Sequence, residues 1–151
     1  VQRIEDVFEL SEKLLQATDA LTGHAADLGG LPAAHYVNMA GRNRMLSQRI
    51  GKFFLFREWP SLDEKIAVLT PPSCHEFESN LQTLRKTANI PPEVAAQLRV
   101  VASQWQKFIQ TLCPDLSHAA RTQHARLVMA EGERLLRGVD TTVKLFERLT
   151  K

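Results

Sequence analysis

Apolar residues recur at intervals of three and four along most of the chain, which is the spacing of amphipathic α-helices. Glycine and proline residues, which punctuate secondary structure, stand between these runs. The pattern predicts five helices, at residues 2–28, 33–58, 74–89, 92–113 and a final stretch from about Ser117 to Leu149. No stretch shows the two-residue alternation of a strand. We therefore expect an all-α protein, an antiparallel up-down four-helix bundle with an additional long N-terminal helix.

The apolar stripe of the first predicted helix is continuous. Its members are Ile4, Val7, Leu10, Leu14, Ala17, Leu21, Ala25 and Leu28. In water this stripe would form a long hydrophobic seam. We therefore expect the first helix to pack along the bundle through it.

The segment before the third predicted helix contains adjacent prolines. Residues 61–73 carry a short apolar pattern before Pro71-Pro72, which suggests one or two turns of helix followed by a loop. Ser73 and Glu76 form a Ser-x-x-Glu capping box, so we expect a helix to begin at residue 74.

The first predicted helix resembles the last. Glu12–Asp19 aligns with Glu133–Asp140, and Val7-Phe8 aligns with Val128-Met129, at a constant offset of 121 positions. Two amphipathic helices that face one core can converge on such a pattern. The alternative is a tandem repeat, in which residues 1–30 are the closing helix of a preceding copy and residues 31–151 form the next copy.

Composition and charge indicate the class of protein. Hydrophobic residues make up 44% and charged residues 24% of the 151 residues, a balance typical of a soluble globular domain. The formal net charge of +2 does not indicate nucleic-acid binding. No stretch reaches the roughly 18 consecutive apolar residues of a membrane span. Because the chain starts and ends within helical pattern, we expect any membrane attachment to come from segments outside it.

The sequence carries no motif of a catalytic site. It contains no glycine-rich phosphate loop, nucleophile elbow or pair of catalytic carboxylates. Its five histidines lack the spacing of metal ligands. We therefore expect neither an enzyme nor a metal site, and no cofactor.

The least ordinary stretch, Asn38–Lys52, holds three arginines and two glycines within a predicted helix. Two sets of its residues share helical faces, Gly41, Arg44, Gln48 and Gly51 on one and Asn38, Arg42, Met45 and Arg49 on another. A glycine costs a helix interior about 1 kcal/mol relative to alanine, so two glycines in line with one arginine indicate close approach by a helix or a ligand. A guanidinium can bind a planar oxyanion through two parallel hydrogen bonds. Alternatively, these arginines are solvated or pair with acidic residues of neighbouring helices.

The run Asn38-x-Ala40-Gly41-Arg42-Asn43-Arg44-Met45-Leu46-Ser47-Gln48-Arg49 is very similar to the signature of the PilJ-like domain of type IV pilus chemotaxis transducers. It also resembles the related periplasmic sensor domain of nitrate/nitrite histidine kinases. The resemblance covers about residues 33–150, and Asn43 stands where the pilus-type signature usually has Gln. It implies an antiparallel four-helix bundle that dimerises in parallel.

In the nitrate-sensing members of that family, the anion lies on the dimer axis between two arginines, and the matching residue here is Arg44. The resemblance therefore implies a nitrate or nitrite site and a homodimer formed through the helix that contains Arg44. We take Arg44, Gly41 and Gln48 as candidate ligand-binding residues, with Asn38, Arg42 and Arg49 as secondary candidates. We expect Arg42 and Arg49 to serve packing or ion pairs if Arg44 binds the anion.

Two cysteines complete the set of candidate residues. Cys74 begins the third predicted helix and Cys113 ends the fourth, and an antiparallel hairpin would place these ends side by side. We expect a disulfide, and the alternative is two independent buried thiols. A disulfide would indicate an oxidising compartment such as the periplasm.

Three functions are compatible with these features. The leading hypothesis is a sensor of a small oxyanion, with Arg44 at a symmetric interface. The second is a helical interaction module that binds a protein partner and no small ligand, in which Arg44 pairs with an acidic residue of its own chain. A basic helix for nucleic acid comes last, because aromatic residues interrupt the cations between Arg42 and Arg57.

Overall fold

The computed structural model describes residues 2–29, 32–112 and 118–149. Its elements are α1 (Gln2–Gly29), α2 (Pro32–Phe56), the short 3-10 helix η1 (Pro60–Leu62), α3 (Asp63–Lys86), α4 (Pro92–Thr111) and α5 (His118–Arg148). The residues in these ranges form no strand, so the predicted all-α class is confirmed.

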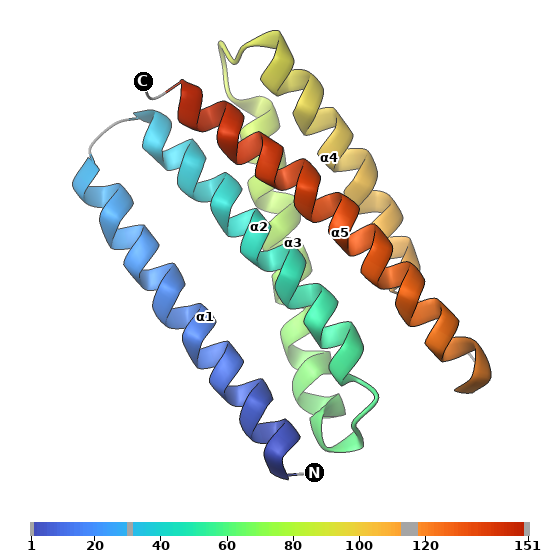
Figure 1. Cartoon of the computed structure of the whole chain (residues 1–151). Helices are drawn as coiled ribbons and strands as arrows, with labels where there is room; N and C mark the ends of the chain where they lie inside the picture. Colours follow the sequence, from blue (N-terminus) through green and yellow to red (C-terminus); the bar gives the residue numbers. More distant parts are fainter. Residues whose placement is uncertain (1, 30–31, 113–117, 150–151) are drawn as a thin grey trace.

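Helices α2 to α5 form a four-helix bundle. Consecutive helices run in opposite directions, and contacts join α2 to α3, α3 to α4, α4 to α5 and α5 back to α2 (Figure 1). Each helix contributes buried apolar side chains to the core between them, for example Leu46, Phe77, Trp105 and Leu135. Trp105 stacks on Phe77 with ring centroids 4.0 Å apart. The predicted up-down bundle is confirmed.

Helix α1 lies outside this ring and runs beside α2 (Figure 1). Its Phe8 is fully buried in a second apolar cluster with Phe53 of α2, Leu62 of η1 and Ile66 of α3. The prediction that the first helix packs along the bundle is therefore confirmed.

The predicted reason for that packing is wrong, because most of the apolar stripe does not face the bundle. Val7, Leu10, Leu14 and Leu21 are all exposed, and only Ile4 of the stripe joins the Phe8 cluster. The side chains of Ala25 and Leu28 lie outside the described residues. Helix α1 thus has two apolar faces, and this bundle covers only one of them.

Helix α3 runs without a break through Pro71 and Pro72. The loop predicted at these prolines is therefore wrong, and so is the helix start at residue 74. Ser73 is buried inside the helix and its hydroxyl donates to the carbonyl of Leu69 at 2.8 Å, so it does not cap an N-terminus.

Burial on both sides of the two prolines explains the continuity of α3. A proline inside a helix costs about 3 kcal/mol relative to alanine, since it lacks an N–H group and its ring crowds the preceding turn. Ile66 before the prolines and Phe77 and Leu81 after them are buried against the rest of the protein. The prolines themselves are exposed, so their rings do not compete for space in the core.

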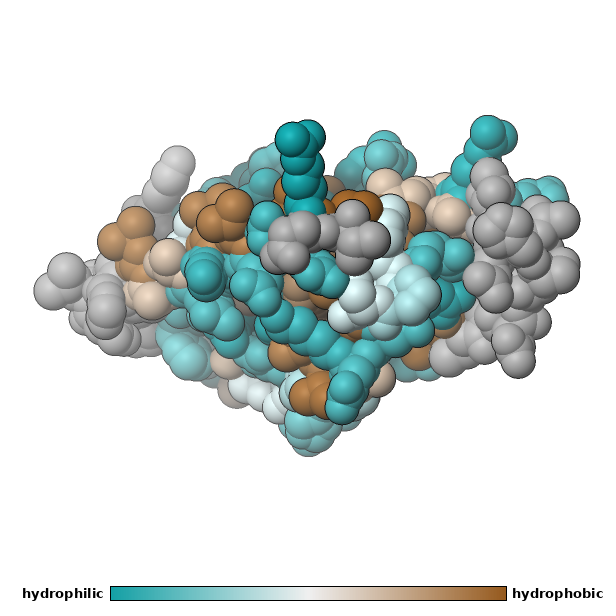
Figure 2. All heavy atoms as spheres, turned by 90° about the horizontal axis from the view of Figure 1, so that it is seen from below, coloured by the Kyte–Doolittle hydropathy of each residue, from teal (hydrophilic) through white to brown (hydrophobic). Residues whose placement is uncertain are grey.

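The surface seen in Figure 2, which views the molecule from below, is mostly hydrophilic, with separate hydrophobic patches between the polar side chains. Among the helices as far as they are described, none is long and apolar enough to cross a membrane.

Candidate functional site

Helix α2 carries the signature stretch and contacts α1, α3 and α5. In Figure 1 it lies between α1 and α5, with α3 behind it. The apolar side chains of α2 enter the interior: Leu46 and Ile50 lie in the main core, Phe53 lies in the Phe8 cluster, and Met39 packs half-buried against the main core. The polar residues of the signature therefore lie on the other faces of α2. Some of them face α1, α3 or α5, and others face solvent between α1 and α5.

Arg42 ties three helices together. Its Nε donates to Glu76 of α3 and its Nη1 donates to Asp19 of α1. The hydrogen bond to Glu76 raises the pKa of Arg42 above its ordinary value, and the bond to Asp19 adds to this effect, although burial opposes both. Arg42 thus forms ion pairs with α1 and α3, and its place as a secondary ligand-binding candidate stays a prediction.

Arg49 and Lys52 converge on Glu12 of α1, and we call this arrangement the Glu12 clamp. Arg49 Nε lies 3.0 Å from Glu12 Oε2, and Lys52 Nζ lies 2.6 Å from Glu12 Oε1. Glu12 is only 8% exposed. Burial alone would raise the pKa of Glu12, but the hydrogen bonds from Arg49 and Lys52 outweigh it and hold the pKa below its ordinary value. Arg49 therefore fastens α1 to α2, as its expected ion-pair role requires.

Arg44 lies in a more open environment than Arg42 and Arg49. Its side chain is 58% exposed, and its Nε lies 3.6 Å from Asp140 Oδ1 of α5, which is beyond hydrogen-bond distance. Asp140 is held more closely by Lys144, at 2.7 Å. The hydrogen bond from Lys144 lowers the pKa of Asp140, and Arg44 adds a smaller contribution. The guanidinium of Arg44 is thus loosely held and accessible to solvent.

A groove of about 210 Å³ lies beside Arg44, and we call it the Arg44 groove. Its lining comes from α2 and α1, and consists of Asn38, Gly41, Arg42, Arg44, Met45, Thr18 and Asp19. Four of the six predicted ligand-binding residues therefore meet here. A Cβ atom added to Gly41 would have no atom within 4 Å, so the backbone at Gly41 is open to an approaching group.

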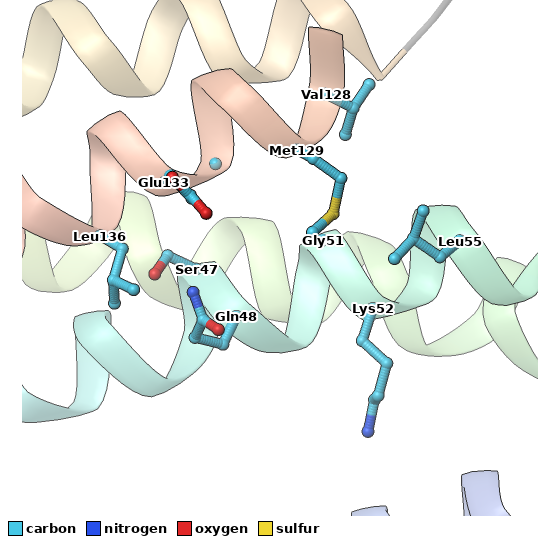
Figure 3. A pocket seen from close by; sticks show the side chains of 10 residues that line it. Ser47, Gln48, Gly51, Lys52, Leu55, Val128, Met129, Glu133 and Leu136 are labelled. Carbon is cyan, nitrogen blue, oxygen red and sulfur yellow. The ribbon is translucent and has the colours of Figure 1, made fainter. Parts of the chain in front are cut away.

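Gln48 and Gly51 lie at a different hollow, of about 280 Å³, between α2 and α5. Figure 3 shows Ser47 and Gln48 of α2 on the side of Glu133 and Leu136 of α5, whereas the ammonium end of Lys52, which also lines the hollow, points away from α5. The four residues predicted to share one face are thus divided. Gly41 and Arg44 line the Arg44 groove, and Gln48 and Gly51 line the hollow against α5.

Asn43 has a structural role that the sequence argument did not identify. It is almost fully buried, its Nδ2 donates to the carbonyl of Phe77 at 3.1 Å, and its Oδ1 accepts a hydrogen bond from Asn80 at 3.0 Å. The Asn43 amide therefore fastens α2 to α3. Its place in the sequence, three residues before the core residue Leu46, was the signal that could have indicated a buried amide.

The predicted disulfide assumed that Cys74 begins a helix, and this assumption is wrong. Cys74 lies inside α3, where it packs half-buried against the main core, and does not begin that helix. Cys113 lies outside the described residues. The pairing of the two cysteines stays a prediction, without the matching helix ends that motivated it.

The described ranges contain no group of three or more His, Cys, Asp or Glu side chains placed to hold a metal ion. The α2 region offers hydrogen bonding and charge, from the mostly exposed guanidinium of Arg44 and an open backbone at Gly41.

Comparison with known proteins agrees with the signature on α2. Neither the curated proteins nor the solved structures include a significant match to this chain. The family model described as type IV pili methyl-accepting chemotaxis transducer N-term matches residues 30–135, which is more than half of the chain and includes α2, α3 and α4 in full. The chain therefore belongs to the PilJ family, the N-terminal sensory domains of type IV pili methyl-accepting chemotaxis transducers.

Proposed function

We propose that this helical sensory domain binds a small oxyanion, nitrate or nitrite, at Arg44, and that it does so at a seam between two copies of α2. The observation that carries the proposal is the state of Arg44, which is 58% exposed and 3.6 Å from its acidic neighbour. Arg42 and Arg49 are already committed to carboxylates. An anion can therefore engage Arg44 without breaking the ties that hold α1 and α3 to α2.

The chemistry of the Arg44 groove suits this ligand. A guanidinium offers paired donors to a planar oxyanion. Liquid water occupies about 30 Å³ per molecule, so the groove has room for a small anion with some of its hydration. Asp140 would lose a weak contact to Arg44, but it keeps Lys144 at 2.7 Å and is not left unpaired.

The position of Arg44 also suits a symmetric interface. Arg44 and Gln48 are exposed on α2 between α1 and α5, and Gly41 adds no side chain to this outward strip. Two copies that meet along the strip would bring two Arg44 residues to one anion. When Arg44 binds the anion, it would release Asp140 of α5. The contact between α2 and α5 would then change, and this change would transmit binding from one helix to the other. We place this sensor outside the cytoplasm, as a binding domain and not an enzyme, in keeping with the transducer family.

The experiment is anion-dependent thermal melting. We expect nitrate or nitrite to raise the melting temperature of the wild type, and Arg44→Ala to abolish the rise while changing stability by on the order of 1 kcal/mol or less, because exposed ion pairs contribute little. Arg44→Lys should also lose most of the response, since an ammonium cannot reproduce the two parallel hydrogen bonds. Sedimentation with and without anion tests the dimer.

Arg99→Ala is the matched control. Arg99 is exposed on α4, the helix diagonal from α2 in the bundle, and its removal should leave the anion response intact. The proposal fails if nitrate, nitrite and sulfate all leave the wild type unchanged, or if Arg44→Ala responds as the wild type does.

The second candidate function is a helical interaction module that binds a protein partner and no anion. The contact of Arg44 with Asp140 of its own chain is the observation that favours it. Under this alternative no small anion stabilises the wild type, and Arg44→Ala changes stability only slightly.

A further inference from the structure

Helix α1 presents a row of large apolar side chains to solvent. Val7, Leu10, Leu14 and Leu21 are 57%, 64%, 67% and 69% exposed. Their spacing of three, four and seven residues places them on one face of the helix. We call this row the α1 stripe. It lies apart from the Phe8 cluster, from the Glu12 clamp and from the Asp19–Arg42 pair, which join α1 to the bundle.

Each residue of the α1 stripe has a counterpart 121 positions later in α5, and all the counterparts are buried. Val7 corresponds to Val128, Leu10 to Glu131, Leu14 to Leu135 and Leu21 to Thr142. The exposed fractions of these α5 residues are 1%, 9%, 0% and 2%. The face that α5 turns into the core of this bundle is therefore the face that α1 leaves in water.

The opposite faces show the reverse pattern. Phe8 and Glu12 are buried where α1 meets α2, and their counterparts Met129 and Glu133 are exposed on α5. Sequence similarity between two amphipathic helices that face the same core would not invert burial in this way. The inversion indicates that α1 resembles α5 in sequence but packs against this bundle through the face that corresponds to the exposed face of α5.

We infer that α1 is the closing helix of a second four-helix bundle of the same family, whose other three helices cover the α1 stripe as α2 and α4 cover α5. Helix α1 is then shared between two bundles. Its stripe belongs to the core of one, and Phe8 and Glu12 attach it to the other. The partner surface is the apolar face of three antiparallel helices equivalent to α2, α3 and α4.

The row also contains a small residue at the place where α4 comes closest to α5. At Gly138 of α5, an added Cβ would overlap Gln104 Oε1, the end of a flexible side chain, and would lie 3.3 Å from Val101 Cγ2. The α1 counterpart is Ala17, which is exposed here, so in the second bundle the side chain equivalent to Gln104 would have to turn aside for its Cβ. A second copy of this chain offers no open face of three helices to the α1 stripe, because α5 already covers the core face of α2 to α4.

The test adds the missing helices. In an extended chain, residues 32–121 are joined directly to Val1, so that α1 takes the register of α5 in the added copy. We expect one cooperative unfolding transition, a fall of about fivefold in the fluorescence of a dye that binds exposed apolar surface, and about tenfold slower amide exchange from Val7 to Leu21, relative to the 151-residue chain.

Leu14→Glu is the diagnostic variant, and Val68→Glu, at an equally exposed apolar residue of α3, is its control. Leu14→Glu should leave the melting temperature of the 151-residue chain within about 2 °C but should separate the added helices from α1 in the extended chain. Val68→Glu in the original copy should do neither. Unchanged dye fluorescence and exchange on extension would overturn the inference. So would a dimer of the 151-residue chain that Leu14→Glu converts to a monomer, since a second copy would then be the occupant.

Discussion

At the residue scale, three arginines of α2 lie in two different kinds of environment. Arg42 and Arg49 are on the same helix as Arg44, yet each is fixed by carboxylates from helices that are distant in sequence. Arg44 meets Asp140 only at 3.6 Å and stays mostly exposed. Buried or half-buried ion pairs are costly to break, whereas exposed ones contribute little. Arg42 and Arg49 are therefore structural residues, and the role that we propose for Arg44 would cost folding little.

Gly41 gives a prediction at the same scale. Since an added Cβ has no atom within 4 Å, Gly41→Ala should stabilise the domain by about 0.5–1 kcal/mol through helix propensity alone. Gly132→Ala is the matched contrast, because its Cβ would lie 3.3 Å from the Phe108 ring and the ring would have to move. The urea unfolding midpoint should rise for Gly41→Ala and rise less, or fall, for Gly132→Ala. A lower midpoint for Gly41→Ala would show that the backbone at this position is not open.

The positions of the candidate residues could be predicted in part from the sequence. Helical geometry placed Arg49 apart from Arg44 and Gly41 beside it, as the structure shows, but it did not predict that Arg42 lines the same groove. The acidic partners could not be predicted, because Glu12 and Asp19 belong to a helix whose orientation toward α2 follows from packing. The division of Gln48 from Arg44 has the same cause, since α5 forms the second wall of the hollow at Gln48.

At the element scale, α3 and α1 show how packing overrides local signals. Adjacent prolines usually interrupt a helix, so Pro71 and Pro72 predicted a loop. Buried residues before and after them nevertheless keep α3 continuous. In α1 the periodicity predicted the helix to within one residue of each end. It could not indicate which of two apolar faces meets the bundle, because both faces satisfy the same spacing.

The prolines of α3 allow a direct test of this balance. Pro71→Ala restores an N–H donor to the carbonyl of Ala67 and relieves the crowded turn, so it should stabilise the domain by roughly 1–3 kcal/mol. Pro92→Ala is the control, since Pro92 stands in the first turn of α4, where proline is favourable. Urea unfolding of both variants measures the difference. Equal effects of the two substitutions would mean that the prolines of α3 impose no cost.

At the scale of the whole molecule, two kinds of contact attach α1 to the four-helix bundle. The Phe8 cluster is apolar and independent of pH, and the Glu12 clamp depends on a carboxylate that is almost buried. Lys65 adds a pair with Glu9 at 2.9 Å, but both side chains are about half exposed. Asp19 adds a pair with Arg42, in which each side chain is about one-third exposed. The most buried charge in this attachment is therefore Glu12, whose removal would leave Arg49 and Lys52 without their shared partner.

This arrangement predicts how the attachment of α1 responds to pH. The pKa of Glu12 in the folded protein lies below its ordinary value, whereas the pKa of a glutamate in the unfolded chain is about 4.3. A lowered pKa gives stability that is fully present above the unfolded value and is lost as pH falls through the folded value. At pH 7, Glu12→Gln should thus cost roughly 1–3 kcal/mol, because two cations lose a buried partner. The difference in unfolding free energy between wild type and Glu12→Gln should shrink as pH is lowered from about 5 to about 3, and amide exchange should show α1 loosening before α2 to α5.

Glu9→Gln on the same helix is the control, and its exposed pair with Lys65 should give a smaller difference at every pH. A difference for Glu12→Gln that stays constant over this range would mean that the carboxylate of Glu12 contributes to the attachment of α1 by packing and not by charge.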